Sequence, residues 1–447
     1  MLRRLEGVVI GEVLTCEKHP DADKLKVTTV SIGKDEPLQI VCGAPNVAAG
    51  QKVIVATVGC TLYPTPEEAF KIKSSKIRGV ESNGMLCAED ELGLGKSHDG
   101  ILVLDNSVAV GTPAAVYFEL EDDYELEIGL TPNRADAMGH IGVARDIIAY
   151  LNVHENATLK LNYPSIDSFS IVDESKSIEI EVENQELCPK YAGLTLKNVK
   201  VKPSPAWLQK RLRAVGLSPI NNIVDATNFV MRELGTPLHA FDADALNGKI
   251  VVKTAEKGAK FVTLDEVERP LSSSNLMITN GTDNLCIAGV FGGLHSGIKP
   301  TTTTVFLESA YFNPVSVRKT AKEHGLNTDA SFRFERGVDP SLTEYALKRC
   351  ALLIQEVAGG TVSMTPKVIG KGIELFTTID FSFERCNQLI GTEIPKEQVI
   401  SILENLECEV TETLTGASVK VPTYRVDVTR ESDLIEEVLR IYGFNNV

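Results

Sequence analysis

Apolar and polar positions divide the chain into stretches with different periods. From residue 5 to about 118, short runs rich in β-branched residues are separated by turn signals such as Ala44-Pro45-Asn46 and Ser82-Asn83-Gly84. Short strands with frequent turns predict an all-β module, and a five-stranded OB-type barrel fits its length. The predicted strands span residues 8–14, 26–32, 38–42, 52–58, 76–77 and 101–104.

The pattern changes after this module. Residues 119–163 form a predicted connector, in which Ile141, Ile148 and Leu151 recur at helical spacing and predict a helix over 138–151. Residues 164–365 mix both periods and predict an α/β domain. Its predicted strands span residues 177–182, 191–199, 250–254, 261–264, 276–279, 285–290 and 305–309, and its predicted helices span 205–214, 225–234 and 341–357.

Two of these helices carry polar side chains of interest. In the helix over 205–214 we expect Trp207 and Leu208 to face the interior, with Lys210, Arg211 and Arg213 facing solvent. The helix over 225–234 ends at Gly235 and Pro237, and His239 follows on a predicted loop. Taken alone, the second helix could be ordinary core and His239 a structural histidine.

Residues 372–447 predict a small α/β module. The order is strand, helix, turn, helix and strand, followed by a further strand and a helix from Glu431 to about Tyr442, and the module is helix-turn-helix-like. The whole chain is therefore predicted to be a multidomain α+β protein. Four carboxylates gather near the last helix, and spacing alone favours a solvated acidic face over a Mg²⁺ site with oxygen ligands. They are Asp427, Asp433, Glu436 and Glu437.

Composition limits what the chain can bind. The net charge is −16, so any contact with RNA must rest on local basic patches. The most basic piece of the first module is the sequence FKIKSSKIRGV, where Lys71 and Lys73 are expected to share one strand face. Such a face can hold a phosphate backbone, although charge alone favours an edge strand guarded by lysines. The basic residues are Lys71, Lys73, Lys76 and Arg78.

Cysteine usage bears on the cellular compartment. The nine cysteines are scattered and never stand in CxxC spacing, which indicates a reducing cytoplasm with neither a disulfide framework nor a zinc site made of cysteines. The first residues lack the apolar run of a signal peptide, and no stretch is long enough to cross a bilayer. We therefore expect a cytoplasmic protein with no membrane partner.

Several motifs resemble a known family. HPDADKLKV, IVCGAPNV, KIRGVESNGMLCAEDELGL and HDGILVL stand in the order found in tRNA-binding OB domains. TPNRAD, followed by HIGVARD, and the segments after it resemble the beta subunit of bacterial phenylalanyl-tRNA synthetase. The resemblance covers essentially all 447 residues. Because members of that family continue beyond the matching part, we expect this sequence to be an N-terminal piece of a longer protein.

The resemblance implies an editing site in the domain over 164–365. In the family this domain hydrolyses tyrosine wrongly attached to tRNA(Phe). The acid of the LES motif, matched by Glu308, recognises the tyrosine hydroxyl, and His239 of PLHAFD would orient water or act as a general base. Matching positions also fall at Thr227, Asn228, Gly289 and Ala330. Thr227 and Asn228 would face the ester, while Gly289 and Ala330 leave room for the ring.

The resemblance also implies partners and cofactors. Asp427, Asp433, Glu436 and Glu437 match a Mg²⁺ site shared with the alpha subunit, and ATP is used by that subunit and not bound here. The expected partners are tRNA(Phe) and the alpha subunit, in an alpha2beta2 heterotetramer. Two alternatives remain: a non-catalytic scaffold that binds tRNA, and a free tRNA-binding protein, which gives the domain over 164–365 no role.

Overall fold

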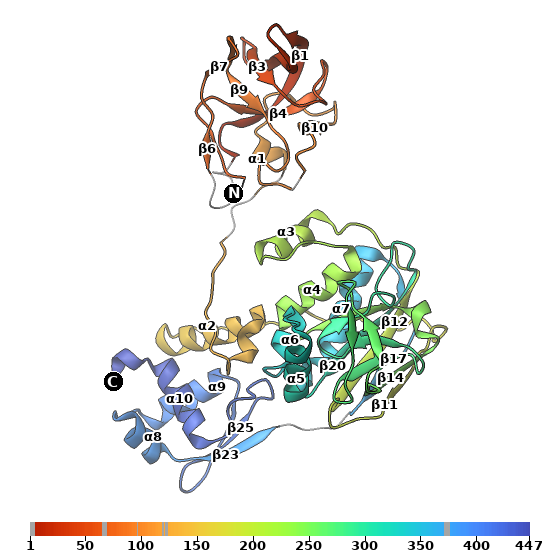
Figure 1. The fold of residues 1–447 in the computed structure, drawn as a ribbon. Helices are drawn as coiled ribbons and strands as arrows, with labels where there is room; N and C mark the ends of the chain where they lie inside the picture. Colours follow the sequence, from red (N-terminus) through yellow and green to blue (C-terminus); the bar gives the residue numbers. More distant parts are fainter. Residues whose placement is uncertain (1–4, 65–68, 96, 119, 121–123, 371–375) are drawn as a thin grey trace. The chain divides into compact units, whose positions relative to one another are not determined.

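The computed structural model describes residues 5–64, 69–95, 97–118, 120, 124–370 and 376–447. The domain boundaries predicted at residues 119 and 372 lie outside the described residues. The chain divides into two compact units, Met1–Leu126 and Glu127–Val447 (Figure 1). No helix in the described part of the chain combines the length and apolar character needed to cross a membrane.

The first unit is built on an antiparallel sheet. Its strand order is β10-β4-β1-β2-β3, with β9 beside β4, and β3 also lies against β9, so the sheet curls toward a barrel. Strands occur in each predicted range, but β1 continues to His19, and β5, β6, β8 and β9 lie outside the predicted ranges. Val53 to Ala56 in β4 are all buried because both faces of that strand are covered. The elements are β1 Val8–His19, β2 Ala22–Ser31, β3 Leu38–Cys42, β4 Lys52–Thr57, β5 Thr61–Leu62, β6 Phe70–Lys71, β7 Ser75–Ile77, β8 Val80–Ser82, β9 Gly84–Leu86, β10 Val103–Leu104 and α1 Ala114–Tyr117.

The second unit contains a mixed α/β domain with two main sheets. One has the order β13-β20-β12-β21, with β22 beside β12, and the other has the order β11-β14-β17-β18-β19. The strands of the first sheet are β12 Lys190–Lys197, β13 Leu238–Asp242, β20 Thr304–Tyr311, β21 Thr361–Val362 and β22 Lys367–Ile369. Those of the second are β11 Glu179–Val182, β14 Lys249–Thr254, β17 Leu276–Thr279, β18 Asn284–Ile287 and β19 Phe291–Gly292, and β15 Lys260–Val262 and β16 Glu268–Pro270 form a separate hairpin.

Five helices complete this domain: α3 Ala206–Ala214, α4 Asn222–Leu234, α5 Pro314–His324, α6 Asp329–Phe334 and α7 Thr343–Ala358. Because side chains alternate along a strand, the two faces of β12 enter different cores. Leu194 and Leu196 pack with α4 and α7, which lie side by side in Figure 1, whereas Tyr191 packs with residues of the second sheet. The first sheet is therefore covered by helices on one face and by the second sheet on the other.

The third part is a small module with its own core. Its sheet has the order β23-β25-β24, and α8, α9 and α10 pack on it together with α2, whose Ala149 belongs to the same core. The strand and helix order agrees with the prediction. The elements are η2 Ala135–Met138, α2 His140–His154, β23 Thr377–Phe381, α8 Phe383–Ile390, α9 Lys396–Asn405, β24 Glu409–Glu412, β25 Ala417–Val421 and α10 Glu431–Tyr442.

Local rules explain helix α4. The side chain of Asn221 accepts hydrogen bonds from the backbone N–H groups of Ile223 and Val224, so the helix begins three residues before the predicted start. Gly235 ends it as predicted, with a φ of 78° that glycine adopts without strain.

Two predictions about this region are wrong. His239 does not lie on a loop but on strand β13, because residues 238–242 pair along their length with β20. Trp207 does not face the interior: its side chain is 41% exposed, because the buried Leu208 and Leu212 occupy the face of α3 that packs on the core. The ring of Trp207 instead meets Phe229 of α4 edge to face, at 5.8 Å between centroids.

Candidate functional site

His239 and Glu308 are direct neighbours across two strands. In the antiparallel pair of β13 and β20, the Cα of His239 stands opposite that of Glu308. Residues in such a position project from the same face of the sheet, with Cβ atoms about 5 Å apart. Phe241 and Phe306 form the next pair on this face and belong to the core shared with the second sheet. The two residues predicted to carry the chemistry therefore share one buried surface.

Glu308 is a buried acid without a cation. Its side chain is 5% exposed, and its Oε2 accepts a hydrogen bond of 2.5 Å from the hydroxyl of Tyr191. No Lys or Arg of the described residues forms an ion pair with it, and Cys188 and Cys286 are among its neighbours. Burial raises the pKa of Glu308 to about 7, although the Tyr191 bond acts in the opposite direction. Close to neutral pH, this carboxyl group can therefore either accept or donate a proton.

Tyr191 is a site residue that the sequence analysis did not identify. It lies on β12, in the predicted strand over 191–199, and its side chain is fully buried. A phenol hydroxyl already bonded to Glu308 demonstrates the geometry by which this carboxylate binds such a group. The second oxygen, Oε1, accepts no hydrogen bond from any residue in the described ranges. A lone aromatic residue in a strand pattern carries no signal for this contact, since it depends on the register of β12 and β20.

His239 stands among aromatic and glycine residues. Its ring meets Phe241 edge to face at 4.4 Å between centroids. A Cβ added to Gly292 would lie 3.1 Å from its Cε1 atom, so glycine allows the close approach of β19. The Nε2 atom is closed off from solvent and has no hydrogen-bond partner in the part of the chain that is described. Burial lowers the pKa of His239 to about 4, so the imidazole is neutral at physiological pH and can accept a proton.

Gly289 and Ala330 lie at a second point of the same core. Gly289 has a φ of 68°, and a Cβ there would stand 2.9 Å from Phe312 and 3.1 Å from Phe334. Those two rings contact each other edge to face. Ala330 precedes Phe334 by one turn of α6 and packs against the same cluster. Small residues at both positions leave room for aromatic rings, which here belong to the protein itself.

Thr227 and Asn228 occupy a different environment. The hydroxyl of Thr227 donates to the carbonyl of Val224 within α4, and the partly exposed Asn228 has no side-chain hydrogen bond among the described residues. The apolar side of α4 packs on the face of the sheet opposite to His239 and Glu308. β13 is the edge strand of that sheet, and α4 contacts it. The structure pairs His239 with Glu308 and places Gly289 and Ala330 beside the same aromatic rings, Phe312 and Phe334.

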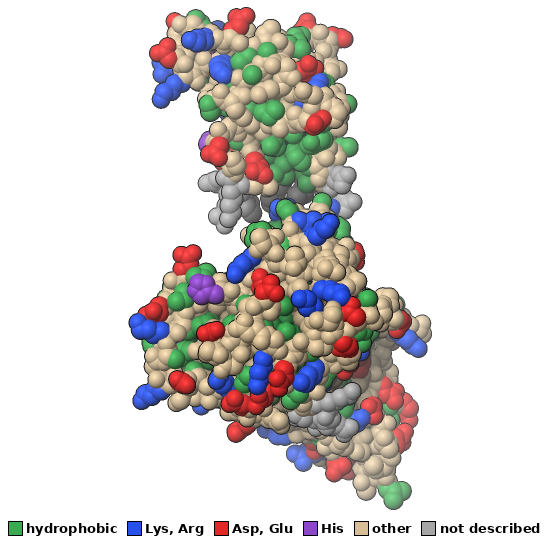
Figure 2. All heavy atoms as spheres, turned by 90° about the vertical axis from the view of Figure 1, so that its right-hand side faces the viewer, with side chains coloured by type: hydrophobic (Ala, Val, Ile, Leu, Met, Phe, Trp, Pro, Cys, Tyr) green, Lys and Arg blue, Asp and Glu red, His purple; other side chains and the backbone are tan. Residues whose placement is uncertain are grey.

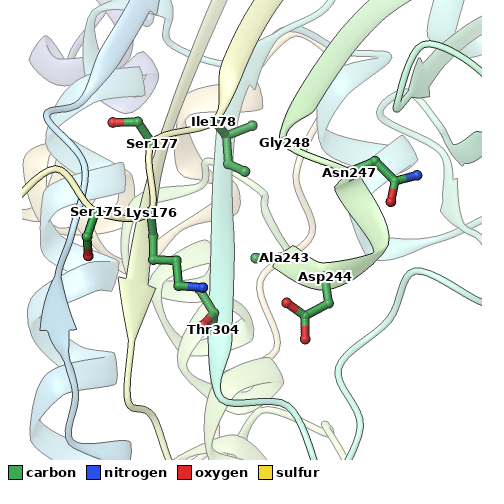
Figure 3. A pocket seen from close by; sticks show the side chains of 9 residues that line it. All are labelled: Ser175, Lys176, Ser177, Ile178, Ala243, Asp244, Asn247, Gly248 and Thr304. Carbon is green, nitrogen blue, oxygen red and sulfur yellow. The ribbon is translucent and has the colours of Figure 1, made fainter.

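An open cavity of about 280 Å³ lies near the start of β20. Figure 3 shows Lys176 reaching toward Thr304, and Asp244 on the other side of the space. None of the predicted site residues lines it. The lining residues are Ser175, Lys176, Ser177, Ile178, Ala243, Asp244, Asn247, Gly248 and Thr304.

The predicted basic residues of the first unit lie on β6, on the segment after it and on the hairpin of β7 and β8. β6 ends at Lys71, but Lys71 and Lys73 are both exposed on either side of the buried Ile72, which is the alternation expected of two residues on one face. Lys76 lies on β7, 3.9 Å from Glu81, and Arg78 occupies the turn of that hairpin with a φ of 45°. These side chains remain available to a polyanion. A continuous basic face would need a longer strand than the turn-rich sequence forms.

The acidic cluster near α10 is held by cations and backbone amides. Glu437 is buried, and its oxygens accept hydrogen bonds from Arg425 at 2.6 and 2.8 Å and from Arg440 at 2.6 Å. Arg425 also binds Asp427. Burial alone would raise the pKa of Glu437, but the two arginines lower it to about 2.

The remaining carboxylates differ. Asp433 accepts hydrogen bonds from the backbone N–H groups of Thr429 and Arg430, and Glu436 is exposed. Within the described ranges no group of three His, Cys, Asp or Glu residues could hold a metal ion. In this arrangement the four carboxylates do not fit a Mg²⁺ site, because Asp427, Asp433 and Glu437 already accept hydrogen bonds from Arg425, Arg440 and the backbone N–H groups at the start of α10. The shared Mg²⁺ site stays a prediction from the resemblance.

Comparison with known proteins agrees with the motifs. Residues 8–113 match the model of the putative tRNA binding domain, residues 187–359 the B3/4 domain and residues 379–444 the tRNA synthetase B5 domain. The chain is 55% identical over 445 residues to the phenylalanine–tRNA ligase beta subunit of Bacteroides fragilis (strain YCH46), covering 99% of this chain and 54% of the relative. The beta subunit of Porphyromonas gingivalis is 53% identical, with 99% and 54% covered, and that of Geobacillus kaustophilus is 44% identical, with 100% and 55% covered.

These similarities confirm the predicted resemblance along the whole chain. They also confirm the predicted fold class, a multidomain α+β protein with a tRNA-binding domain, a B3/4 domain and a B5 domain. The chain spans about half the length of the curated relatives that it matches. His239 and Glu308 lie in the part that matches the B3/4 domain, and the acidic cluster lies in the part that matches the B5 domain.

Proposed function

We propose that this chain, a relative of phenylalanine–tRNA ligase beta subunits over its whole length, binds tRNA and hydrolyses tyrosine wrongly esterified to tRNA(Phe). The reaction takes place on the inner face of the sheet that carries His239 and Glu308. The first unit holds tRNA, with Lys71, Lys73, Lys76 and Arg78 toward its backbone. The chain works within an alpha2beta2 assembly, in which the alpha subunit uses ATP and attaches phenylalanine.

The observation that carries the proposal is the Tyr191–Glu308 hydrogen bond beside His239. A buried carboxyl that binds one phenol hydroxyl, and has a second oxygen unused, is suited to bind another. Tyrosine satisfies that oxygen, whereas phenylalanine leaves the buried group unpaired. Pockets built around such a hydrogen bond can discriminate against the analogue that lacks the hydroxyl by about 10⁴-fold or more.

His239 supplies the base. An unpaired nitrogen of its neutral imidazole accepts the proton of a water molecule while the water oxygen bonds to the ester carbonyl carbon. The carbon–oxygen bond to the ribose then breaks, and the imidazolium returns the proton to the ribose oxygen. With a pKa of about 4, His239 is ready to accept a proton throughout the physiological range. General base assistance of this kind contributes about 10²- to 10⁴-fold in rate.

Hydrolysis of a small tyrosyl ester tests the proposal without requiring tight RNA binding. Tyrosyl adenosine and phenylalanyl adenosine esters would be incubated with the 447-residue chain and with its Glu308→Ala and His239→Ala variants. We expect His239→Ala to lower the rate on the tyrosyl ester about 100-fold or more, and Glu308→Ala to lose most of the preference for tyrosyl over phenylalanyl ester. Glu356→Gln, at an exposed position of α7, is the control and should retain both. Equal rates for wild type, both variants and buffer would contradict the editing function and favour a non-catalytic scaffold.

The second candidate is that non-catalytic function, in which the domain only binds tRNA and supports the alpha subunit. The environment of α4 favours it, because the apolar side of that helix packs on the sheet face opposite to His239, and Thr227 hydrogen-bonds within its own helix. A structure with bound tyrosine separates the two. The editing function requires the tyrosine hydroxyl within hydrogen-bond reach of Glu308, and a tyrosine bound elsewhere would support the scaffold.

A further inference from the structure

One segment of the second unit has a charge opposite to that of the whole chain. Between residues 187 and 224 the sequence contains seven Lys and Arg and no Asp or Glu, although the chain has 61 acidic and 45 basic residues. A local excess of this kind creates a positive surface inside a negative global field. The seven are Lys190, Lys197, Lys200, Lys202, Lys210, Arg211 and Arg213.

The structure separates the cations with internal roles from the exposed ones. Lys197 binds Asp173, and the ammonium of Lys190 donates to the carbonyl of Pro340. Lys200, Lys202 and Arg211 are exposed and form no ion pair with a described residue. Arg213 is also exposed, and its one side-chain hydrogen bond to a described residue goes to Gln209 of its own helix. The basic charge thus gathers around α3 and the segment just before it.

Helix α3 also presents an aromatic ring. Trp207, the only tryptophan in the chain, is 41% exposed and lies one helical turn before Arg211, on the same side of the helix. Its edge rests on Phe229 of α4, which fixes the ring while one part stays open to solvent. Leu208 and Leu212 already fill the contact of α3 with the core, so packing does not require Trp207. An exposed, fixed ring among cations needs a different explanation.

We propose that this surface, formed by Trp207, Arg211, Arg213, Lys200 and Lys202, binds the backbone and one unpaired base of an RNA strand. Phosphates pair with Arg and Lys, and bases stack on aromatic rings whatever their sequence. The exposed ring favours RNA over an acidic protein segment, because it offers bases a stacking surface in addition to the cations. The surface borders α4, which carries Thr227 and Asn228. Figure 1 shows α3 at the top of the second unit, next to α4. Figure 2 shows Lys and Arg side chains at the top of the same unit.

The proposal rests on the proposed function only in identifying the RNA as the tRNA whose ester is hydrolysed. A strand held on α3 would keep the RNA near this domain while its end is processed, independently of the first unit. The small-ester assay separates the two ideas. Variants of α3 should hydrolyse tyrosyl adenosine ester as wild type does, since that substrate has no phosphate backbone.

The single tryptophan provides a direct test. Emission of Trp207 would be followed while the 447-residue chain is titrated with unacylated tRNA transcript at several salt concentrations. We expect saturable quenching whose affinity falls steeply with salt. The variant Lys202→Gln/Arg211→Gln/Arg213→Gln should bind about 10-fold or more weakly near 0.1 M salt, with the slope of log affinity against log salt smaller by about 2. Trp207→Ala, read by anisotropy of labelled tRNA, should bind about 5-fold or more weakly through lost stacking.

A control with the same charge change lies on α5. Arg318→Gln/Lys319→Gln/Lys322→Gln removes three exposed cations of the same domain and should change affinity less than 3-fold. Equal losses in the α3 and α5 variants would show that only net charge matters and would overturn the proposal. Binding of labelled tRNA without quenching of Trp207 would also overturn it. So would quenching by added alpha subunit but not by tRNA, which would make α3 a protein interface.

Discussion

Two buried glutamates in the second unit have opposite electrostatic surroundings. Glu437 in the B5 domain lies between Arg425 and Arg440, and its pKa is lowered to about 2. Glu308 in the B3/4 domain has a tyrosine hydroxyl as its partner, and burial raises its pKa to about 7. Both side chains are 5% exposed. The depth of burial is thus the same, and the partner alone decides the charge state.

The difference separates an acid held by arginines from one that we propose to be functional. A carboxylate that already has two arginines has few lone pairs left for a ligand, and its removal chiefly affects stability. A carboxyl kept near its titration point by burial, without a cation, costs stability and has binding capacity left over. Perturbed acids of that second kind cluster at functional sites. This contrast supports Glu308 as the specificity residue and counts against a cation site built on Glu437.

Replacing Arg425, the partner of Glu437, should have the largest effect on stability. Arg425→Met leaves Glu437 buried with only Arg440, and it also removes the ion pair of Asp427. Breaking a buried pair from one side costs about 3–5 kcal/mol, because a charge stays buried without compensation. The measurement is hydrogen exchange of the α10 backbone amides, which reports the opening free energy of the B5 domain.

A second arginine of the same domain is the matched control. Arg385 pairs with Glu431 but its side chain is 67% exposed, so Arg385→Met should cost less than about 1 kcal/mol. Equal effects of the two substitutions would mean that the Arg425–Glu437 pair is no more structural than a surface pair, and the contrast with Glu308 would fail.

Neutralising Glu308 should raise the stability of the fold, whereas removing Arg425 should lower it. The pKa of Glu308 is raised in the folded state, from 4.5 to about 7, so its ionisation opposes folding as the pH rises through that window. Glu308→Gln keeps an oxygen for Tyr191 and removes the charge. We expect stabilisation of about 2–3 kcal/mol at pH 8 and almost none at pH 4.5. Urea unfolding followed by Trp207 emission reports on this domain.

Protonation of His239 also changes the stability of the fold at low pH. Its folded pKa of about 4 lies below the ordinary 6.5, so the neutral form contributes stability above pH 6.5 that is lost as the pH falls toward 4. The pH series should therefore be compared between Glu308→Gln and wild type, since the His239 contribution is common to both. A stabilisation that does not change with pH would mean that Glu308 is not an ionising buried acid.

Much of the fold follows from local pattern. Turn signals mark the strands of the first unit, and the cap at Asn221 and the stop at Gly235 delimit α4. The helix from Glu431 to Tyr442 has the predicted bounds. In each case the determining interactions lie within a few residues, where periodicity and capping rules apply.

The rest depends on contacts between distant residues. Strand β13 spans five residues after a proline, and only its pairing with β20, some seventy positions later, makes His239 a strand residue. The Tyr191–Glu308 bond depends on the register of β12 against β20. Trp207 is as apolar as Leu208, and only the packing of α3 decides which one is exposed. The partners of Glu308 and Glu437 could therefore not be deduced from spacing.

The direct test of this account is the titration of Glu308 itself. Carboxyl carbon NMR of the chain labelled at glutamate side chains, assigned with Glu308→Gln and Glu437→Gln, would follow both groups with pH. The account predicts that Glu308 titrates near pH 7, that Glu437 stays ionised to about pH 2, and that added tyrosine amide shifts the Glu308 signal alone. A Glu308 titration near 4.5, with no response to tyrosine amide, would contradict it.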